Sequence, residues 1–223
     1  MTSRRDTVKL IRSGKVTVDG VTLRDPSQKI DETAAVAVNG VPLPYQSFTY
    51  LMMNKPAGIL CVSRDPKAHT VVDLVPPALK RKGLFPAGRL DKDTVGLVLL
   101  TDDGDFAHRL LAPRKHVEKT YHAIVDGPIT EEHIRRFAEG TTLVDGTHCL
   151  PAKLQVLKAG DRPLVEVRIV EGKYHQIKRM FGTIDRGVVW LKRCTMGGLA
   201  LDESLQPGEC RPLTEKEREN IFK

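Results

Sequence analysis

The sequence contains little cysteine, few aromatic residues and no long apolar run. Of its 223 residues, 5% are aromatic and four are cysteine, namely Cys61, Cys149, Cys194 and Cys210. These cysteines lack the spacing of about two to four residues that is usual at structural zinc sites. No apolar run reaches the ~18 residues of a membrane-spanning helix, and residues 1–5 lack the apolar stretch of a secretion signal. We therefore expect reduced thiols, no bound metal, no membrane partner and a cytoplasmic location.

The sequence does carry an excess of positive charge. Lysine and arginine number 35 against 28 aspartates and glutamates, which gives a formal net charge of +7 at pH 7. An excess of this sign favours a polyanionic partner, with nucleic acid as the first candidate. The hydrophobic share of 40% is sufficient for one medium-sized core and a small appendage.

The first 43 residues predict a small unit of one helix and a few short strands. Residues 3–13 have the capping residues and the apolar side of a short helix. The pairs Asp19-Gly20 and Asn39-Gly40 each lie between short apolar runs, which is typical of tight β-hairpins. We expect this unit to have little stability by itself.

The rest of the chain predicts a larger α+β domain. We interpret residues 1–43 as the small module, 44–49 as a linker and 50–223 as the main domain. Strands often follow one another without an intervening helix, so a mixed, largely antiparallel sheet with flanking helices is favoured over a doubly wound parallel sheet. Strands are expected over residues 50–53, 59–63, 96–101, 117–125, 153–158, 164–170 and 188–192, and helices over residues 105–111, 131–139, 174–182 and 215–222.

The most informative segment runs from Gly88 to Gly104, with the sequence GRLDKDTVGLVLLTDDG. Residues 97–100 predict a buried strand, and Asp91 lies in the loop that leads into it. Loops held by a rigid strand often carry catalytic groups. The alternative is that Asp91 only caps a turn, and for Asp93 we expect no role beyond solvation.

A second segment, EKTY, opens a strand at Glu118. Alternation places Lys119 and Tyr121 on the same face, so Tyr121 is expected to point inward. A buried tyrosine on a strand can be a core residue whose hydroxyl finds a partner. It can also be a platform on which a nucleic-acid base stacks.

The third segment is EGKYHQIKRMF, residues 171–181. A helical projection places Ile177, Met180 and Phe181 on the core side. Lys178 then lies on the flank in a half-buried position, and Arg179 points to solvent or to a phosphate. The alternative is a solvated basic helix face. Residues 168–193 contain seven basic and two acidic side chains, which suits a surface that follows a phosphate backbone.

Together, the three segments resemble the motifs of pseudouridine synthases, in the expected order. In that family an arginine and a leucine, here Arg89 and Leu90, precede the catalytic aspartate. The resemblance implies that Asp91 is the nucleophile and that Tyr121 stacks on the target base. It also implies that Lys178, two residues after Gln176, pairs with the aspartate.

Finer features resemble the RsuA-type branch, whose members modify small-subunit ribosomal RNA. These features are Tyr174-His175-Gln176 and the segment at residues 207–213. Large-subunit enzymes of the same branch remain the alternative. Residues 3–43 resemble the alpha-L RNA-binding module of this branch, without its first helix. The expected RNA-binding residues are Arg4, Arg5, Arg12, Lys15, Lys173 and Arg179.

The resemblance implies a reaction in which uracil is detached, rotated and rejoined to ribose through carbon 5. The product is an isomer, so no cofactor is expected. The uridine must be flipped out of its stack to reach the pocket. The expected partner is ribosomal RNA, most specifically 16S RNA or a small-subunit assembly intermediate, and the expected state is a monomer. The rival interpretations are a non-catalytic RNA-binding assembly factor and, less favoured, a methyltransferase, for which a glycine-rich cofactor loop is missing.

Overall fold

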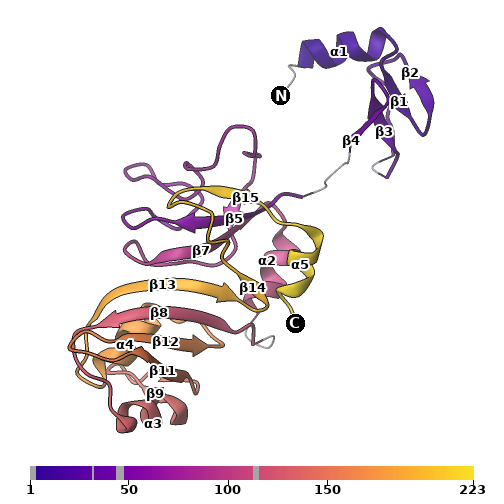
Figure 1. Ribbon diagram of the computed structural model, residues 1–223. Helices are drawn as coiled ribbons and strands as arrows, with labels where there is room; N and C mark the ends of the chain where they lie inside the picture. Colours follow the sequence, from indigo (N-terminus) through magenta and orange to yellow (C-terminus); the bar gives the residue numbers. More distant parts are fainter. Residues whose placement is uncertain (1–3, 32, 44–47, 113–115) are drawn as a thin grey trace. The chain divides into compact units, whose positions relative to one another are not determined.

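The computed structural model describes residues 4–31, 33–43, 48–112 and 116–223, and the chain divides into two compact units, Met1–Phe48 and Thr49–Lys223. Helix α1 (Arg4–Arg12) opens the first unit (Figure 1). Four antiparallel strands follow, in the sheet order β2-β1-β3-β4. They are β1 (Val16–Val18), β2 (Val21–Leu23), β3 (Val36–Val38) and β4 (Val41–Leu43).

Both hairpins of the first unit close through the turns that the sequence predicts. Asp19 and Gly20 have φ of 49° and 81°, and Asn39 and Gly40 have φ of 52° and 78°. Two consecutive positive φ values match the right-handed twist of paired strands, and aspartate, asparagine and glycine accept them most readily. The predicted helix and both hairpins are therefore present. The predicted linker lies mostly at residues 44–47, outside the described residues.

The second unit is built on one mixed sheet in which nine strands of the described residues take part. Its central path runs β11-β12-β8-β13-β7-β5-β15, with β14 paired to β13 and β6 paired to β7. The pairs are antiparallel except that β13 runs parallel to β7. The strands are β5 (Tyr50–Lys55), β6 (Phe85–Pro86), β7 (Val95–Thr101), β8 (Lys119–Val125), β11 (Lys153–Lys158), β12 (Leu164–Ile169), β13 (Val188–Met196), β14 (Leu199–Ala200) and β15 (Cys210–Pro212).

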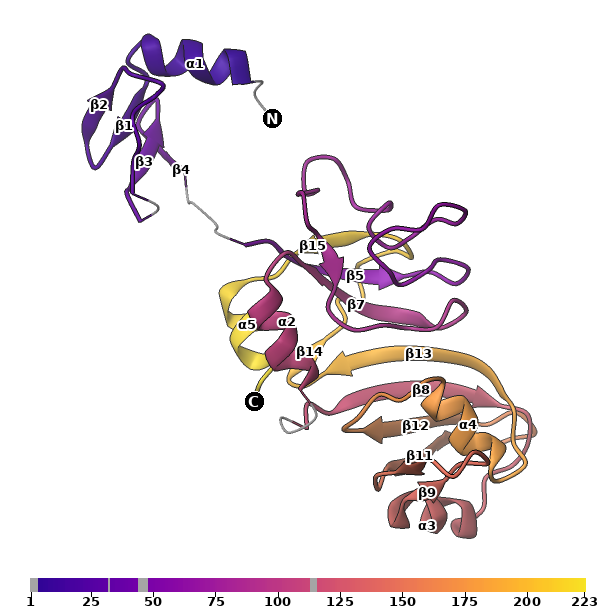
Figure 2. The same ribbon diagram turned by 180° about the vertical axis from the view of Figure 1, so that it is seen from behind.

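Helices cover both faces of this sheet. Alternate residues of β7 separate the two cores, with Leu97 and Leu99 on one face and Val98 and Leu100 on the other. Helices α2 (Gly104–Leu111) and α5 (Glu215–Asn220) lie side by side on the Leu97 face (Figures 1 and 2). The opposite face carries α3 (Glu131–Glu139) and α4 (Gln176–Gly182), beside the small ribbon of β9 (Thr141–Thr142) and β10 (His148–Cys149). The predicted α+β class with a largely antiparallel sheet is confirmed.

Several predicted elements differ from the structure in their bounds or their kind. The strand predicted over residues 188–192 runs to Met196, the strand predicted over 117–125 begins at Lys119, and the helix predicted over 215–222 ends at Asn220. Residues 59–63 form no strand, and Leu60 makes an isolated parallel bridge to Thr70. Their apolar character serves a loop whose Cys61 is buried in the core. The fourth helix begins at Gln176 rather than at residue 174, because His175 takes a left-handed conformation with φ of 48°. All four cysteines are free thiols.

Candidate active site

A cavity of about 710 Å³ opens in the second unit where the loop before β7 meets β8, β13 and the start of α4. Residues of β8 and β13 form the part of its lining that we call the inner wall, and residues 169–178 and the Asp91 loop also line it. The residues on which its chemistry depends are Arg89, Asp91, Lys119, Tyr121, Lys178 and Arg193. The cavity therefore brings together all three segments that the sequence singles out.

The loop that carries Asp91 is tied to the core by a buried lysine. Lys55, the last residue of β5, is fully buried, and its Nζ donates to the carbonyls of Pro56 at 3.0 Å, Lys92 at 3.1 Å and Thr94 at 2.9 Å. Burial lowers the pKa of Lys55. Three acceptors compensate the ammonium for lost hydration, and two of them belong to the Asp91 loop. The role of Lys55 was not predicted from the sequence. A lysine at the end of an apolar strand, directly before a proline, could have indicated a buried anchoring residue.

Lys178 lies between two carboxylates. Its Nζ is 3.5 Å from Oδ2 of Asp91, and it donates to both Asp93 carboxylate oxygens at 2.6 and 2.7 Å. These hydrogen bonds hold the pKa of Asp93 below its ordinary value. The half-buried position expected for Lys178 is correct, but Asp93 is more than a solvated residue: it competes with Asp91 for the same cation.

His175 also lies beside Asp91. Its Nε2 is 3.5 Å from Oδ1 of Asp91, and its ring stacks on Tyr174 with a centroid separation of 3.9 Å. The left-handed backbone of His175 turns the chain into α4 at this point. From the sequence, Tyr174 and His175 were expected only to distinguish one branch of the family. A positive φ at histidine is uncommon, and nothing local in the sequence predicts it.

Gln176 stabilises the segment that leads into α4. This side chain is buried, its Nε2 donates to Glu171 at 2.7 Å, and its Oε1 accepts from the Lys173 backbone N–H at 2.9 Å. The Lys173 ammonium forms an ion pair with Glu171. Gln176 therefore closes the turn that carries His175 and leads into α4, on which Lys178 lies. Lys173, one of the expected RNA-binding residues, has its charge paired within this turn.

Tyr121 lies on the inner wall of the cavity. It is 7% exposed, and its neighbours on the same face of β8 are buried as the alternation predicts. Among the described residues, no protein group accepts or donates a hydrogen bond at its hydroxyl. Arg89 also lines the cavity, and Leu90 is buried in the core beneath it. The Tyr121 ring and the Asp91 carboxylate thus line the same cavity.

Two further cations lie on this wall: Lys119, which had no expected role, and Arg193, which was expected on a surface that follows phosphates but is buried by β7 and β8 instead. Lys119 is 9% exposed and donates to the Val117 carbonyl at 2.8 Å. Arg193 is 2% exposed, donates from Nε to the Leu97 carbonyl at 2.8 Å, and has one terminal nitrogen without a partner. Burial and the nearby Arg193 lower the pKa of Lys119 to about 8. The predicted alternation did place Lys119 on the Tyr121 face.

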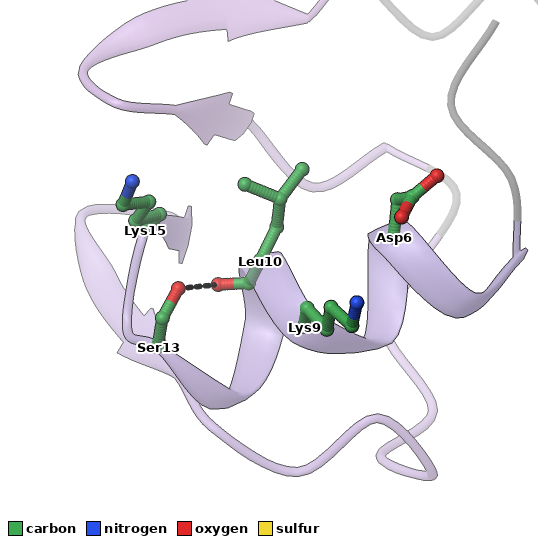
Figure 3. A pocket seen from close by; sticks show the side chains of 5 residues that line it. All are labelled: Asp6, Lys9, Leu10, Ser13 and Lys15. Atoms are coloured by element: carbon green, nitrogen blue, oxygen red, sulfur yellow. Dashed lines mark hydrogen bonds between the residues drawn. The ribbon is translucent and has the colours of Figure 1, made fainter.

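Other expected RNA-binding residues lie elsewhere. Arg4, Arg5, Arg12 and Lys15 are exposed on the first unit, and Lys15 lines a shallow hollow beside α1, in which Ser13 donates to the Leu10 carbonyl (Figure 3). Arg179 was expected to point to solvent or phosphate. It instead pairs with Asp145 and donates to the Tyr174 carbonyl at 3.3 Å, because the loop after β9 presents a carboxylate to that side of α4.

The described part of the chain contains no cluster of three or more histidine, cysteine, aspartate or glutamate side chains placed to hold a metal ion. Within the same residues, no helix has the length and apolar character to cross a membrane. The cavity itself is lined by the carboxylates of Asp91 and Glu171, by aromatic rings and by several cations.

Comparison with known proteins identifies this combination. The sequence pattern of RNA pseudouridylate synthases matches residues 49–183. The chain belongs to the RNA pseudouridine synthase family. A pseudouridine synthase is an isomerase, and the cavity with its three motif segments lies almost wholly within the matched residues.

Similar proteins extend the match over nearly the whole pseudouridine synthase. "Uncharacterized RNA pseudouridine synthase YtzG" of Bacillus subtilis (strain 168) is 44% identical over 218 residues, which cover 96% of this chain and 91% of that protein. "Ribosomal small subunit pseudouridine synthase A" of Escherichia coli (strain K12) is 43% identical over 209 residues, which cover 93% and 89%. A crystal structure of a pseudouridylate synthase matches with a TM-score of 0.72 and 37% identity, over 98% of this chain and 94% of that one. These similarities place the enzyme in the RsuA-type branch.

Proposed function

We propose that this pseudouridine synthase isomerises one specific uridine of 16S small-subunit ribosomal RNA, with Asp91 as its nucleophile. The observation that supports this chemistry is the convergence of Asp91, Tyr121 and Lys178 on one cavity. The choice of RNA rests on the 43% identity to relatives named ribosomal small subunit pseudouridine synthase A. The substrate is this RNA or a small-subunit assembly intermediate, and the enzyme acts as a monomer.

Each of the three side chains has a distinct task. The uridine flips out of its stack into the cavity, where its base lies on the ring of Tyr121. The Asp91 carboxylate then acts at the ribose. Because the bound base displaces water, the carboxylate loses hydration, and the Lys178 ammonium compensates for that loss. Uracil is rejoined through carbon 5, so the reaction needs no second substrate.

RNA beyond the target nucleotide is held by exposed cations. Arg4, Arg5, Arg12 and Lys15 carry four positive charges on the first unit, which we propose is a partial alpha-L RNA-binding module. Contacts of this kind supply affinity without reading sequence. Lys173 and Arg179 at the cavity side contribute once RNA phosphates compete with Glu171 and Asp145 for them.

Pseudouridine mapping of ribosomal RNA tests the proposal. A strain in which the gene is deleted should lose one pseudouridine from 16S RNA, and the wild-type gene should restore it. The Asp91→Asn gene should not. Loss of a 23S site instead would mean that the enzyme acts on the large subunit, and an unchanged map would favour a non-catalytic assembly factor.

A further inference from the structure

Lys119 and Arg193 have fewer hydrogen-bond acceptors and carboxylates around their charges than Lys55 and Lys178, the other buried or half-buried cations of the site. Lys55 donates to three carbonyls, and Lys178 faces two carboxylates. Within the described residues, Lys119 has one carbonyl acceptor, and Arg193 has one carbonyl acceptor and a terminal nitrogen without any. The Arg193 guanidinium and the Lys119 ammonium thus bring two positive charges into a wall that is more than nine-tenths buried.

No described carboxylate forms an ion pair with either of them. Glu171 acts on Lys119 at longer range, but its own oxygens are engaged by Lys173, by Gln176 and by the backbone N–H of Leu150. Burying a charge without a partner costs several kcal/mol in proteins. The Arg193 charge acts on Lys119 and adds to this cost. Lysines whose pKa is lowered by burial and by a nearby charge are found preferentially at functional sites. The wall therefore has room for a negative group that the described residues do not supply.

The position of the two cations indicates which negative group that is. Arg193 on β13 is the register partner of Tyr121 on β8, and Lys119 is two residues before Tyr121 on the same face. The cations thus flank the ring on which the base is proposed to stack. Phosphates of a flipped nucleotide keep their hydration at a pocket mouth, whereas the base enters the buried end.

We propose that Lys119 and Arg193 stabilise the uracil anion that forms when the base is detached from its ribose. This inference rests on the proposed function, in particular on Asp91 acting at the ribose and on the base lying against Tyr121. It adds to that function a pair of residues that contact the leaving group and act on the step in which the glycosidic bond breaks.

The electron count shows why cations are needed at this place. The C1′–N1 bond breaks with its electron pair left on the base, where the charge spreads over N1, O2 and O4. At the sugar, an Asp91 carboxylate oxygen bonds to C1′, or the carboxylate accepts the C2′ proton. Carbon 5 of the rotated base then bonds to C1′ while the C1′–Asp91 bond breaks or Asp91 returns the proton to C2′. Water takes the proton from C5 and supplies one to N1, so the product is an isomer of the substrate. Preorganised cations around a developing anion lower the barrier because they need no reorientation during the reaction.

The test uses the full-length enzyme, with an RNA fragment that the wild-type protein modifies, under single-turnover conditions. Lys119→Met should lower the rate at saturating enzyme by about 100-fold, while the RNA dissociation constant changes less than about threefold. Lys119→Arg, which keeps the charge, should recover part of the rate. Lys153→Met, an exposed lysine on β11, is the matched control and should behave as wild type. Arg193→Gln gives a second measurement if it folds, as judged by its thermal unfolding.

A substrate with a better leaving group separates this role from a structural one. Fluorine at carbon 5 withdraws electrons and stabilises the detached anion by itself. With 5-fluorouridine at the target position, detachment is followed as loss of that nucleoside from digests. The defect of Lys119→Met should then shrink at least about fivefold relative to the uridine substrate.

Three results would overturn the inference. Equal defects with both substrates would make Lys119 structural. Lys119 would instead contact a phosphate if Lys119→Met had a normal saturating rate, a raised RNA dissociation constant and a salt dependence of binding weaker by about one phosphate contact. A wild-type rate for Lys119→Met would remove the role altogether. These results can be told apart from a failure of the proposed function. That function fails if the Asp91→Asn enzyme is active or if the 16S map is unchanged by the deletion, and both experiments leave Lys119 intact.

Discussion

Replacing Lys178 with methionine tests whether the aspartate depends on its ammonium neighbour. Methionine keeps the unbranched apolar stem and removes the charge that lies 3.5 Å from Asp91. At that separation the attraction is about 2 to 5 kcal/mol for effective dielectric constants of about 40 to 20. Lys178 and Asp91 are 24% and 25% exposed, so solvent screening favours the lower half of that range, and the rate should fall about 100-fold.

Asp93 makes the experiment sharper. In the free enzyme Lys178 is closer to Asp93 than to Asp91, but the Asp93 side chain is 73% exposed, and exposed ion pairs contribute little. Asp93→Asn should therefore release Lys178 toward Asp91 and raise the single-turnover rate by up to about threefold. If Asp93→Asn were as damaging as Lys178→Met, the pair formed with Asp93 would be the functional one.

The assay is formation of pseudouridine in a defined RNA fragment, measured by nuclease digestion and chromatography at saturating enzyme. Lys158→Met removes an exposed lysine at the end of β11 and serves as the control for the loss of one positive charge. The reasoning is refuted if Lys178→Met and Lys158→Met turn over RNA at the same rate. Another cation of the cavity would then have to accompany Asp91.

Three further outcomes are expected. Asp91→Asn should abolish product while the RNA dissociation constant, measured by filter binding, stays within about threefold of wild type; substantial residual turnover would remove the nucleophile role. Tyr121→Ala should lower kcat/KM by roughly 5- to 150-fold, since stacking is worth about 1–3 kcal/mol per base, and Tyr121→Phe should lose far less; equal losses would implicate the hydroxyl. Acid should destabilise the fold through Glu217, because the hydrogen bond from Arg211 lowers the pKa of Glu217 to about 2. A carboxyl group whose pKa is lowered by folding stabilises the fold fully above pH ~4.5, and this stabilisation is lost as the pH falls toward 2. Denaturant titrations should show that the free energy of unfolding drops by on the order of 2 kcal/mol over this range, after allowance for screening. Arg211→Met should flatten the pH dependence.

Local patterns in the sequence were enough to predict much of the fold. Alternation identified β8 and placed Tyr121 on an inward face, and the turn residues at Asp19-Gly20 and Asn39-Gly40 predicted the hairpins. Residues 131–139 and 153–158 form a helix and a strand at the predicted bounds. These features depend on a few neighbouring residues, so a single sequence contains them.

The contacts that complete the site depend on distant parts of the chain. Lys55 meets acceptors 37 and 39 residues away, and Arg193 donates to Leu97, 96 residues earlier. His175 takes a left-handed conformation at the junction into α4. The apolar run at residues 59–63 looks like a strand but packs as a loop. Propensity carries no information on such contacts, because tertiary packing decides them.

Because Lys55 anchors the Asp91 loop, the two segments that meet beside Asp91, this loop and the turn at residues 171–175, differ in how firmly they are held. A shift of the Asp91 loop strains the buried hydrogen bonds that it accepts from Lys55. The turn at residues 171–175 is held mainly by contacts within residues 171–176, with a further hydrogen bond between Glu171 and Leu150. The Asp91 carboxylate is therefore held in a fixed position. We expect the turn at residues 171–175 to be the part of the cavity that adapts to RNAs of different shape. Related enzymes that modify different nucleotides should therefore differ mainly at the turn and little at the Asp91 loop.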